Sequence, residues 1–426
     1  MNNFDFLSLI IDSPYTYTIC ILLALATFYF IYKRIIISVL DPFFLTQLFS
    51  AIGFATVLFL LLQNIISTKI FLQYILSQSA FIIGFFTFKK IFKSENYNFS
   101  MNQNQTQFFL FFFFTLIFFI QIYIYSTKGI PLLMKSRLEL YRGGSGVGIF
   151  SRILDVAYPA FYFSMSSLWF SYRRKTIYKV LFAITLFFLV LSGSKSSFLM
   201  PVYGFFIFTV FNGNTDQLLQ LFKKNRKWIL SGVFLMVLLI IYIQALDSNS
   251  DSGALFRLGL RIIFAGDIYW YAYPFETYKI VDASHPFQSI FLDFVGLFRI
   301  TDWSKIESTV GLELYQYFHP TDLLMGPNSR HNVFGMVYFG FWGSIVFSLI
   351  LGLITSVFRF LFLKLSKKNI VTGIFYSCLY LNAVTFEIDP MLGFTHLNNI
   401  VFILPFLILL GLCLFELIFK FTLVND

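Results

Sequence analysis

The sequence predicts an all-α polytopic membrane protein of about eleven transmembrane helices (ten to twelve) with two elaborated external loops. Three observations predict this class. The 426-residue chain is 58% hydrophobic and only 12% charged, well below the charged share of a soluble domain. Apolar runs near the roughly 20 residues needed to cross a bilayer recur along the chain. Its 61 phenylalanines exclude a disordered protein.

The candidate spans follow one another at short intervals, and each contains a window of about 19 mostly apolar residues. The first run lacks the basic n-region of a cleaved signal peptide and follows Asp5 and Asp12, which predicts a retained span. The runs on either side of 193–195 are so close that they could instead form a hairpin dipping into a protein cavity. The predicted spans are 14–33, 42–63, 70–88, 107–127, 153–172, 176–192, 196–212, 228–246, 331–357, 370–387 and 399–420.

The distribution of positive charge predicts an external N-terminus and a cytoplasmic C-terminus. In this orientation more than half of the 31 Lys and Arg residues fall in cytoplasmic segments, as the positive-inside rule requires. Most of the others lie in two external segments, about 128–152 and 247–330. The predicted organisation is therefore a single transmembrane domain, 1–426, whose chemistry faces the outside.

The second external segment contains a run, 254–273, that is almost apolar enough to be another span. Arg257 and Arg261 stand at its centre, and inserting two arginines costs about 5–7 kcal/mol, more than the apolar residues return. An interfacial helix is therefore predicted. The two arginines are four residues apart and share one face, which either binds a lipid-linked phosphate or anchors the helix to anionic lipid.

Several function classes are excluded by what the sequence lacks. The net charge of +10 is not accompanied by any nucleic-acid-binding motif, so no nucleic-acid partner is predicted. The three cysteines lie in apolar runs and the four histidines have no zinc spacing, which predicts neither disulfides nor a metal. A phosphate-binding loop and a Gly-x-Ser-x-Gly elbow are both missing, so ATP-driven transport by this chain alone is unsupported.

Two external basic features could bind an anion. Arg137 and Arg142 precede a glycine-rich run, 143–148, and guanidinium groups beside accessible backbone amides suit a phosphate. The alternative is a solvated basic loop near lipid headgroups. Lys195 lies among serines at an external helix junction, where it either meets an anionic substrate or snorkels to finish a span.

A third group of residues leads from the large external loop into the ninth predicted span. Glu313 and His331 could accept a proton from a sugar hydroxyl, and Arg330 could hold a phosphate beside them. Alternatively, His331 simply caps the helix start. Glu387 and Asp389 end the tenth span, where they either bind a divalent metal or bond to an arginine; the pair is too weak a pattern to predict a metal.

Together these features resemble the bacterial O-antigen and capsular repeat-unit polymerases of the Wzy type. The resemblance lies in the basic glycine-rich loop, the LSGSKSS junction and a large external loop that ends in NSRHN before a glycine-rich helix. Arg137 and Gly148 match the Arg-x10-Gly pattern of such polymerases. The related O-antigen ligases carry a His-amide pair ahead of a Gly-x-x-Gly, which His331-Asn332 and Gly340-x-x-Gly343 resemble at a shorter spacing.

The resemblance implies a glycosyltransferase-C-like bundle in the bacterial cytoplasmic membrane that joins undecaprenyl-diphosphate-linked oligosaccharides by inverting transfer. The leaving diphosphate would be stabilised by basic side chains, and His331 or Glu313 would remove the acceptor proton. No metal or cofactor is implied. Membrane lipid is a further partner, and a chain-length regulator and a flippase are candidates. The basic side chains concerned are Arg137, Arg142, Lys195, Arg257, Arg261 and Arg330.

Three rival functions stay open at this point: O-antigen ligation, polysaccharide flipping or other transport, and metal-dependent transfer of a lipid-linked sugar. A transporter would concentrate ionisable residues within its spans more often than in a long external loop. A metal-dependent transferase usually has acidic residues in its first external loop, whereas the first interhelical loop here is short and predicted to be cytoplasmic. Both patterns favour the polymerase.

Overall fold

The computed structural model describes residues 3–88, 102–134, 147–171, 176–193, 197–213, 264–291, 309–320, 326–364 and 368–424, with isolated positions 220, 223, 227, 294 and 300. All regular elements among these residues are helices. Seven of the described helices are long and apolar enough to cross a membrane. The chain is therefore a helical multi-pass membrane protein, and the count of about eleven spans stays a prediction.

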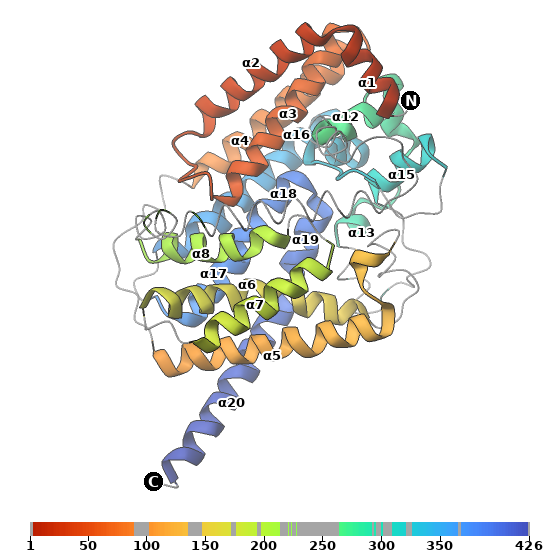
Figure 1. Ribbon diagram of the computed structural model, residues 1–426. Helices are drawn as coiled ribbons and strands as arrows, with labels where there is room; N and C mark the ends of the chain where they lie inside the picture. The colour runs from red at the N-terminus through yellow and green to blue at the C-terminus, as the bar shows by residue number, and fades with distance from the viewer. Residues whose placement is uncertain are drawn as a thin grey trace. The chain divides into compact units, whose positions relative to one another are not determined.

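Capping residues and prolines mark the positions at which several of the helices begin. Asp41 caps the third helix by accepting from the Phe43 amide (3.1 Å), with Pro42 at the first helical position. Asn102 caps the fifth helix in the same way, through the Gln105 amide (3.2 Å). The α-helices are α1 (Asn3–Asp12), α2 (Pro14–Tyr32), α3 (Pro42–Leu62), α4 (Thr68–Thr87), α5 (Gln103–Lys128), α6 (Val147–Ser171), α7 (Thr176–Leu191), α8 (Met200–Phe211), α12 (Asp267–Ala272), α13 (Pro286–Ile290), α15 (Val310–Phe318), α16 (His331–Phe360), α17 (Ile370–Ala383), α18 (Thr385–Ile388), α19 (Pro390–Asn398) and α20 (Leu404–Val424) (Figure 1).

Five short 3-10 helices and one π-helix complete the described elements. They are η1 (Pro131–Leu133), η3 (Ser197–Leu199), η4 (Phe264–Gly266), η5 (Pro274–Ile280), η7 (Leu361–Lys364) and the π-helix η8 (Asn399–Ile403). The π-helix joins α19 to α20. The 3-10 helices mostly stand next to α-helix ends, where tighter turns are common.

The seven candidate spans correspond to seven of the predicted ones. They are Pro14–Tyr32, Pro42–Leu62, Thr68–Thr87, Gln103–Leu133, His331–Leu363, Ile370–Ile388 and Pro390–Ile418. The predicted spans 153–172, 176–192 and 196–212 are also helical, but α7 and α8 have only 16 and 12 residues, too few to cross a bilayer alone. The predicted span 228–246 lies outside the described residues.

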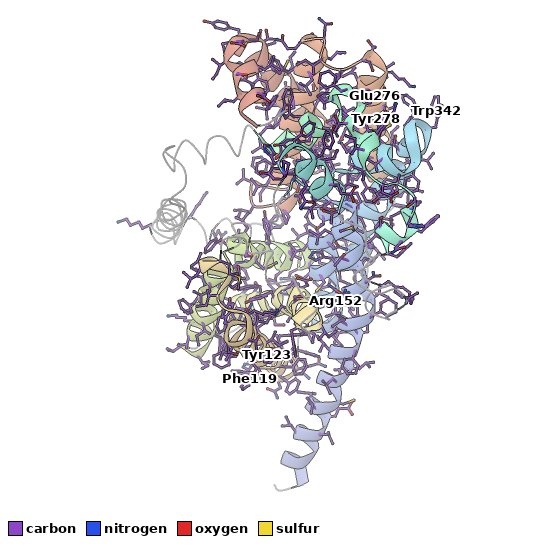
Figure 2. The ribbon with its side chains drawn as sticks, turned by 90° about the vertical axis from the view of Figure 1, so that its right-hand side faces the viewer. Phe119, Tyr123, Arg152, Glu276, Tyr278 and Trp342 are labelled. Atoms are coloured by element: carbon purple, nitrogen blue, oxygen red, sulfur yellow. The ribbon has the colours of Figure 1, made fainter. Side chains whose placement is uncertain are left out.

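The chain divides into two compact units. Unit 1 comprises 1–89, 224–356 and 384–392, and unit 2 comprises 90–223, 357–383 and 393–426. In unit 1, α2 packs along α3, and η4 and α12 pack on α3 (Figure 1). In unit 2, α6 packs against α5, α8 and α17, while Phe119 and Tyr123 on α5 are exposed, as lipid-facing residues are (Figure 2).

Helix α16 is broken at Gly340 and folds back on itself within unit 1. Gly340 has φ +66° and ψ −166°, a conformation essentially restricted to glycine. His331 Nδ1 and Ser348 Oγ are 2.8 Å apart, although a straight helix would separate residues 17 positions apart by about 26 Å. Phe334 and Phe347 also stack, with ring centroids 5.5 Å apart. The predicted span 331–357 is therefore a half-helix, 331–339, packed against a longer segment that begins at 341.

The longer segment of α16 begins at the surface of unit 1 and then packs closely on α4. Trp342 is 75% exposed at its start (Figure 2), a position typical of aromatic anchors at a membrane interface. Deeper in the segment, a Cβ on Gly352 would overlap the Phe81 carbonyl oxygen, and one on Gly84 would overlap that of Leu349. The two glycines thus allow the backbones of α4 and α16 to approach each other.

We expect the Gly352→Ala substitution to destabilise the protein by about 1–3 kcal/mol, because the added methyl group has no space between the two backbones. Thermal unfolding of the purified protein in detergent measures the effect. Ile350→Ala, at a side chain 47% exposed on the same segment, is the control and is expected to change stability by less than about 0.5 kcal/mol. Equal effects of the two substitutions would contradict the close packing.

Candidate functional site

The half-helix of α16 begins inside unit 1, where the preceding residue, Arg330, is only 5% exposed. The Arg330 amide donates to the Ile388 carbonyl (2.9 Å), and its own carbonyl accepts from Phe334 (3.0 Å). Arg330 has φ +49°, a left-handed conformation that costs an arginine about 1–2 kcal/mol. The surrounding bonds therefore hold Arg330 in a strained conformation, as is common at functional sites.

The fold-back at Gly340 determines which positions along α16 and α4 lie next to His331. Ser348, the partner of His331, lies about 10 Å along the second segment of α16, counted from its start. Gln78, the other partner, lies about 15 Å along α4. His331, which the sequence predicts at the external end of a span, thus lies beside interior positions of α4 and of the second segment of α16.

The Arg330 guanidinium has two bonds to described residues. Its Nη1 donates to Ser50 Oγ (2.8 Å) and its Nη2 to the Ala265 carbonyl (3.4 Å). No described carboxylate lies within ion-pair distance of it, although Glu387 and Asp267 interact with it electrostatically. An arginine has five N–H donors, so three of them have no partner among the described residues. A buried guanidinium with unused N–H donors is suited to bind an anion.

Glu387, on α18, is 1% exposed and is held by neutral donors. Gln47 Nε2 donates to one carboxylate oxygen (2.6 Å) and Gln78 Nε2 to the other (3.5 Å), and Ser50 also bonds to it. Ser50 therefore links Glu387 to Arg330. Of the two sequence interpretations of Glu387, association with an arginine agrees with this arrangement. No group of three or more potential His, Cys, Asp or Glu metal ligands occurs among the described residues.

Both ring nitrogens of His331 form hydrogen bonds with neighbouring side chains. Gln78 Oε1 accepts from Asn332 Nδ2 (3.1 Å) and lies 3.1 Å from His331 Nε2, so this ring nitrogen carries the proton. The other nitrogen, Nδ1, then accepts from Ser348 Oγ at 2.8 Å. The ring also stacks on Phe81, with centroids 4.8 Å apart. These contacts fix the orientation of His331 and leave its basic nitrogen already bonded.

Two tyrosines of unit 1 complete the polar network. Tyr269 donates to Asn332 Oδ1 (2.7 Å) and Tyr273 to Gln73 Oε1 (3.1 Å), while Gln73 donates to the Asn332 carbonyl (3.1 Å). The tyrosines reach the site because η4 approaches α3 closely: a Cβ on Gly266 would lie 2.5 Å from Thr56 Oγ1. Residues 267–273, the end of the predicted interfacial helix 254–273, are thus packed against protein. Residues 264–266 of that predicted helix form η4, and residues 254–263 lie outside the described residues.

Asp267 begins α12 next to this network. Desolvation raises the pKa of its carboxyl to about 7, although the Ile268 amide and the Arg330 charge both oppose this shift. The side chain is half-buried. Asp267 is thus an acid that releases its proton near neutral pH, which is the property expected of a general base.

The structure describes three of the eight site residues predicted from the sequence. Arg330 and His331 are adjacent but have different partners. Glu313, on α15, accepts from the Asp282 amide (3.4 Å), and neither ring nitrogen of His331 bonds to it. The other five predictions lie outside the described residues: Arg137, Arg142, Lys195, Arg257 and Arg261.

Sequence reasoning overlooked Asp267 and the polar residues that hold Glu387. A signal for the latter was available, because Gln47, Gln73 and Gln78 stand within otherwise apolar spans, and amides there need partners. Asp267 gave no such signal, because it is a single acid in the predicted interfacial helix 254–273. No family model, curated protein or solved structure matches this chain.

Proposed function

We propose that this chain is a glycosyltransferase that polymerises undecaprenyl-diphosphate-linked oligosaccharide repeat units into O-antigen or capsular polysaccharide. The reaction would take place at the external face of a bacterial cytoplasmic membrane, with inversion at the anomeric carbon and without a metal. The observation that carries the proposal is the buried Arg330, which has unused donors and no ion-pair partner among the described residues.

A deeply placed arginine suits a lipid-linked diphosphate. The diphosphate departs with its bonding electron pair, and its developing charge requires donors aimed at it in a place of low dielectric. Arg330 is held in position by Ser50, Ala265 and Ile388 before any substrate arrives. The basic residues predicted from the two external loops would supply further donors.

The acceptor hydroxyl must also lose a proton. His331 and Glu313 are the candidates that the resemblance implies. In this conformation His331 Nδ1 accepts from Ser348, so His331 would act as a base only after that hydroxyl turned away. Its bonds favour a role in orienting the half-helix next to Arg330.

Transport of the lipid-linked oligosaccharide is the second candidate function. The broken helix α16 favours it, because discontinuous helices with ionisable residues near the membrane midplane are typical of transporter binding sites. Ligation of finished polysaccharide to a different acceptor would use the same leaving group and is a third outcome to distinguish.

Deleting the gene and resolving the surface polysaccharide on a gel separates these functions. We expect glycans truncated to one repeat unit, because the host can still make, move and attach single units. Restoring the gene on a plasmid should restore the ladder. A full-length ladder in the deletion strain would contradict the polymerase. Complete loss of surface repeats would favour transport or ligation.

A further inference from the structure

An aromatic cluster lies near Asp267 in unit 1, where Asp267 interacts electrostatically with Tyr271 and Tyr315. Tyr271 follows Asp267 by one helical turn and therefore lies on the same face of α12. Its ring contacts Tyr315 of α15 (centroids 5.8 Å apart), and its hydroxyl lies 3.3 Å from His319 Nε2. The rings of Tyr315 and His319 are also in contact, with centroids 4.7 Å apart. Three aromatic rings are thus gathered beside one carboxyl group.

The cluster has the composition of a carbohydrate site. Tyr271 is fully buried, whereas Tyr315 and His319 are half-exposed and so present ring surface. Sugar rings have apolar C–H faces that pack on aromatic rings, and their hydroxyls bond to carboxylates and imidazoles. Desolvation lowers the pKa of His319, so its ring is neutral near pH 7 and can both donate and accept.

Asp267 is also close to the arginine proposed to bind the diphosphate. The Ala265 carbonyl accepts from Arg330, and Asp267 follows Ala265 by two residues, at most about 7 Å along the chain. A substrate that placed its phosphates on Arg330 would therefore place its anomeric carbon near the Asp267 carboxyl group. Glu387 is also close to Arg330, through Ser50, but it is 1% exposed and is held by Gln47 and Gln78, whereas Asp267 is only half-buried.

We infer that Tyr315 and His319 form the subsite for the acceptor sugar, with Tyr271 supporting them, and that Asp267 takes the proton from the attacking hydroxyl. This inference rests on the proposed function. The acceptor oxygen forms a bond to the anomeric carbon, and the bond from that carbon to the diphosphate oxygen breaks. The electron pair leaves with the diphosphate, which Arg330 stabilises, and the hydroxyl proton passes to the carboxylate.

The pH dependence follows from the groups that face Asp267. Arg330, which precedes α16, favours the carboxylate, and Tyr271 and Tyr315 are neutral near pH 7; beyond Tyr271 lies Asp5 of α1. Since burial raises the pKa of Asp267 to about 7, the base is protonated below this pH. The polymerisation rate should therefore rise as the pH increases through about 7 and then level off.

The test uses the full-length protein in liposomes, supplied with the lipid-linked repeat unit that accumulates when the gene is deleted. We expect Asp267→Asn to lower kcat by about 10²–10⁴-fold and to abolish the rise near pH 7. Asp267→Glu should retain part of the rate and of the pH dependence. Asp282→Asn, at an exposed acid of the same unit, is the matched control and should leave both unchanged.

Two tyrosines of α15 test the sugar subsite separately. Tyr315→Ala should raise the KM for the acceptor by about tenfold or more, whereas Tyr317→Ala, at a side chain 57% exposed, should not. An active wild-type enzyme whose Asp267→Asn variant keeps its pH profile, or whose Tyr315→Ala variant keeps its KM, would overturn the inference and leave the proposed function standing. A wild-type protein that forms no polymer would overturn both.

Discussion

The Arg330→Gly variant is expected to fold and to lose polymerisation by at least about 10²-fold, the usual effect of removing a donor that stabilises developing charge. Glycine adopts the positive φ of this position without strain, so relief of about 1–2 kcal/mol offsets part of the lost bonding to Ser50 and Ala265. The rate of polymer formation in liposomes and the melting temperature in detergent should therefore respond very differently.

Arg330→Lys separates charge from geometry. Lysine keeps a positive charge but cannot reproduce the planar, bidentate contact, so we expect an intermediate loss of about 10–100-fold. Arg34→Gly, at an exposed arginine between α2 and α3, is the matched control and should leave the rate unchanged. Normal polymer length and rate with Arg330→Gly would remove Arg330 from the reaction.

The second large effect is expected from Gly340→Ala. Gly340 lies at the fold-back of α16, in a backbone conformation that costs other residues about 1–3 kcal/mol. A Cβ at this position would meet nothing within 4 Å, so the effect is one of conformation and not of crowding. Straightening α16 would separate His331 from Ser348 and displace Arg330 from Ser50. We therefore expect a lower melting temperature together with loss of polymerisation.

Gly148→Ala provides the control for the change in melting temperature. Gly148 lies inside α6, and a Cβ there also has open space around it. Because its φ is not positive, alanine should be tolerated and should favour the helix by about 0.5–1 kcal/mol. If Gly340→Ala left both the melting temperature and polymerisation unchanged, the fold-back would have no functional importance.

The candidate site could be predicted only in part. The order of residues along the chain identifies Arg330 and His331, because a basic and an imidazole side chain immediately precede an apolar run. It does not reveal that Gln47 bonds to Glu387, 340 positions away, because such a pairing depends on how spans pack side by side. Asp267 was missed for a related reason: the raised pKa of its carboxyl comes from desolvation, which depends on how other parts of the chain pack around it.

The sequence by itself determined that this is a helical multi-pass membrane protein, and it located the seven candidate spans, most of them to within a few residues. Hydropathy is a local average, and a bilayer selects spans by length and apolarity, so both can be read along the chain. The tertiary structure alone decided that 331–360 folds back and that Arg330, just before the half-helix, is buried in the interior of unit 1. The sequence does not show whether a glycine within an apolar run has a positive φ. The burial of a residue likewise depends on the helices packed around it.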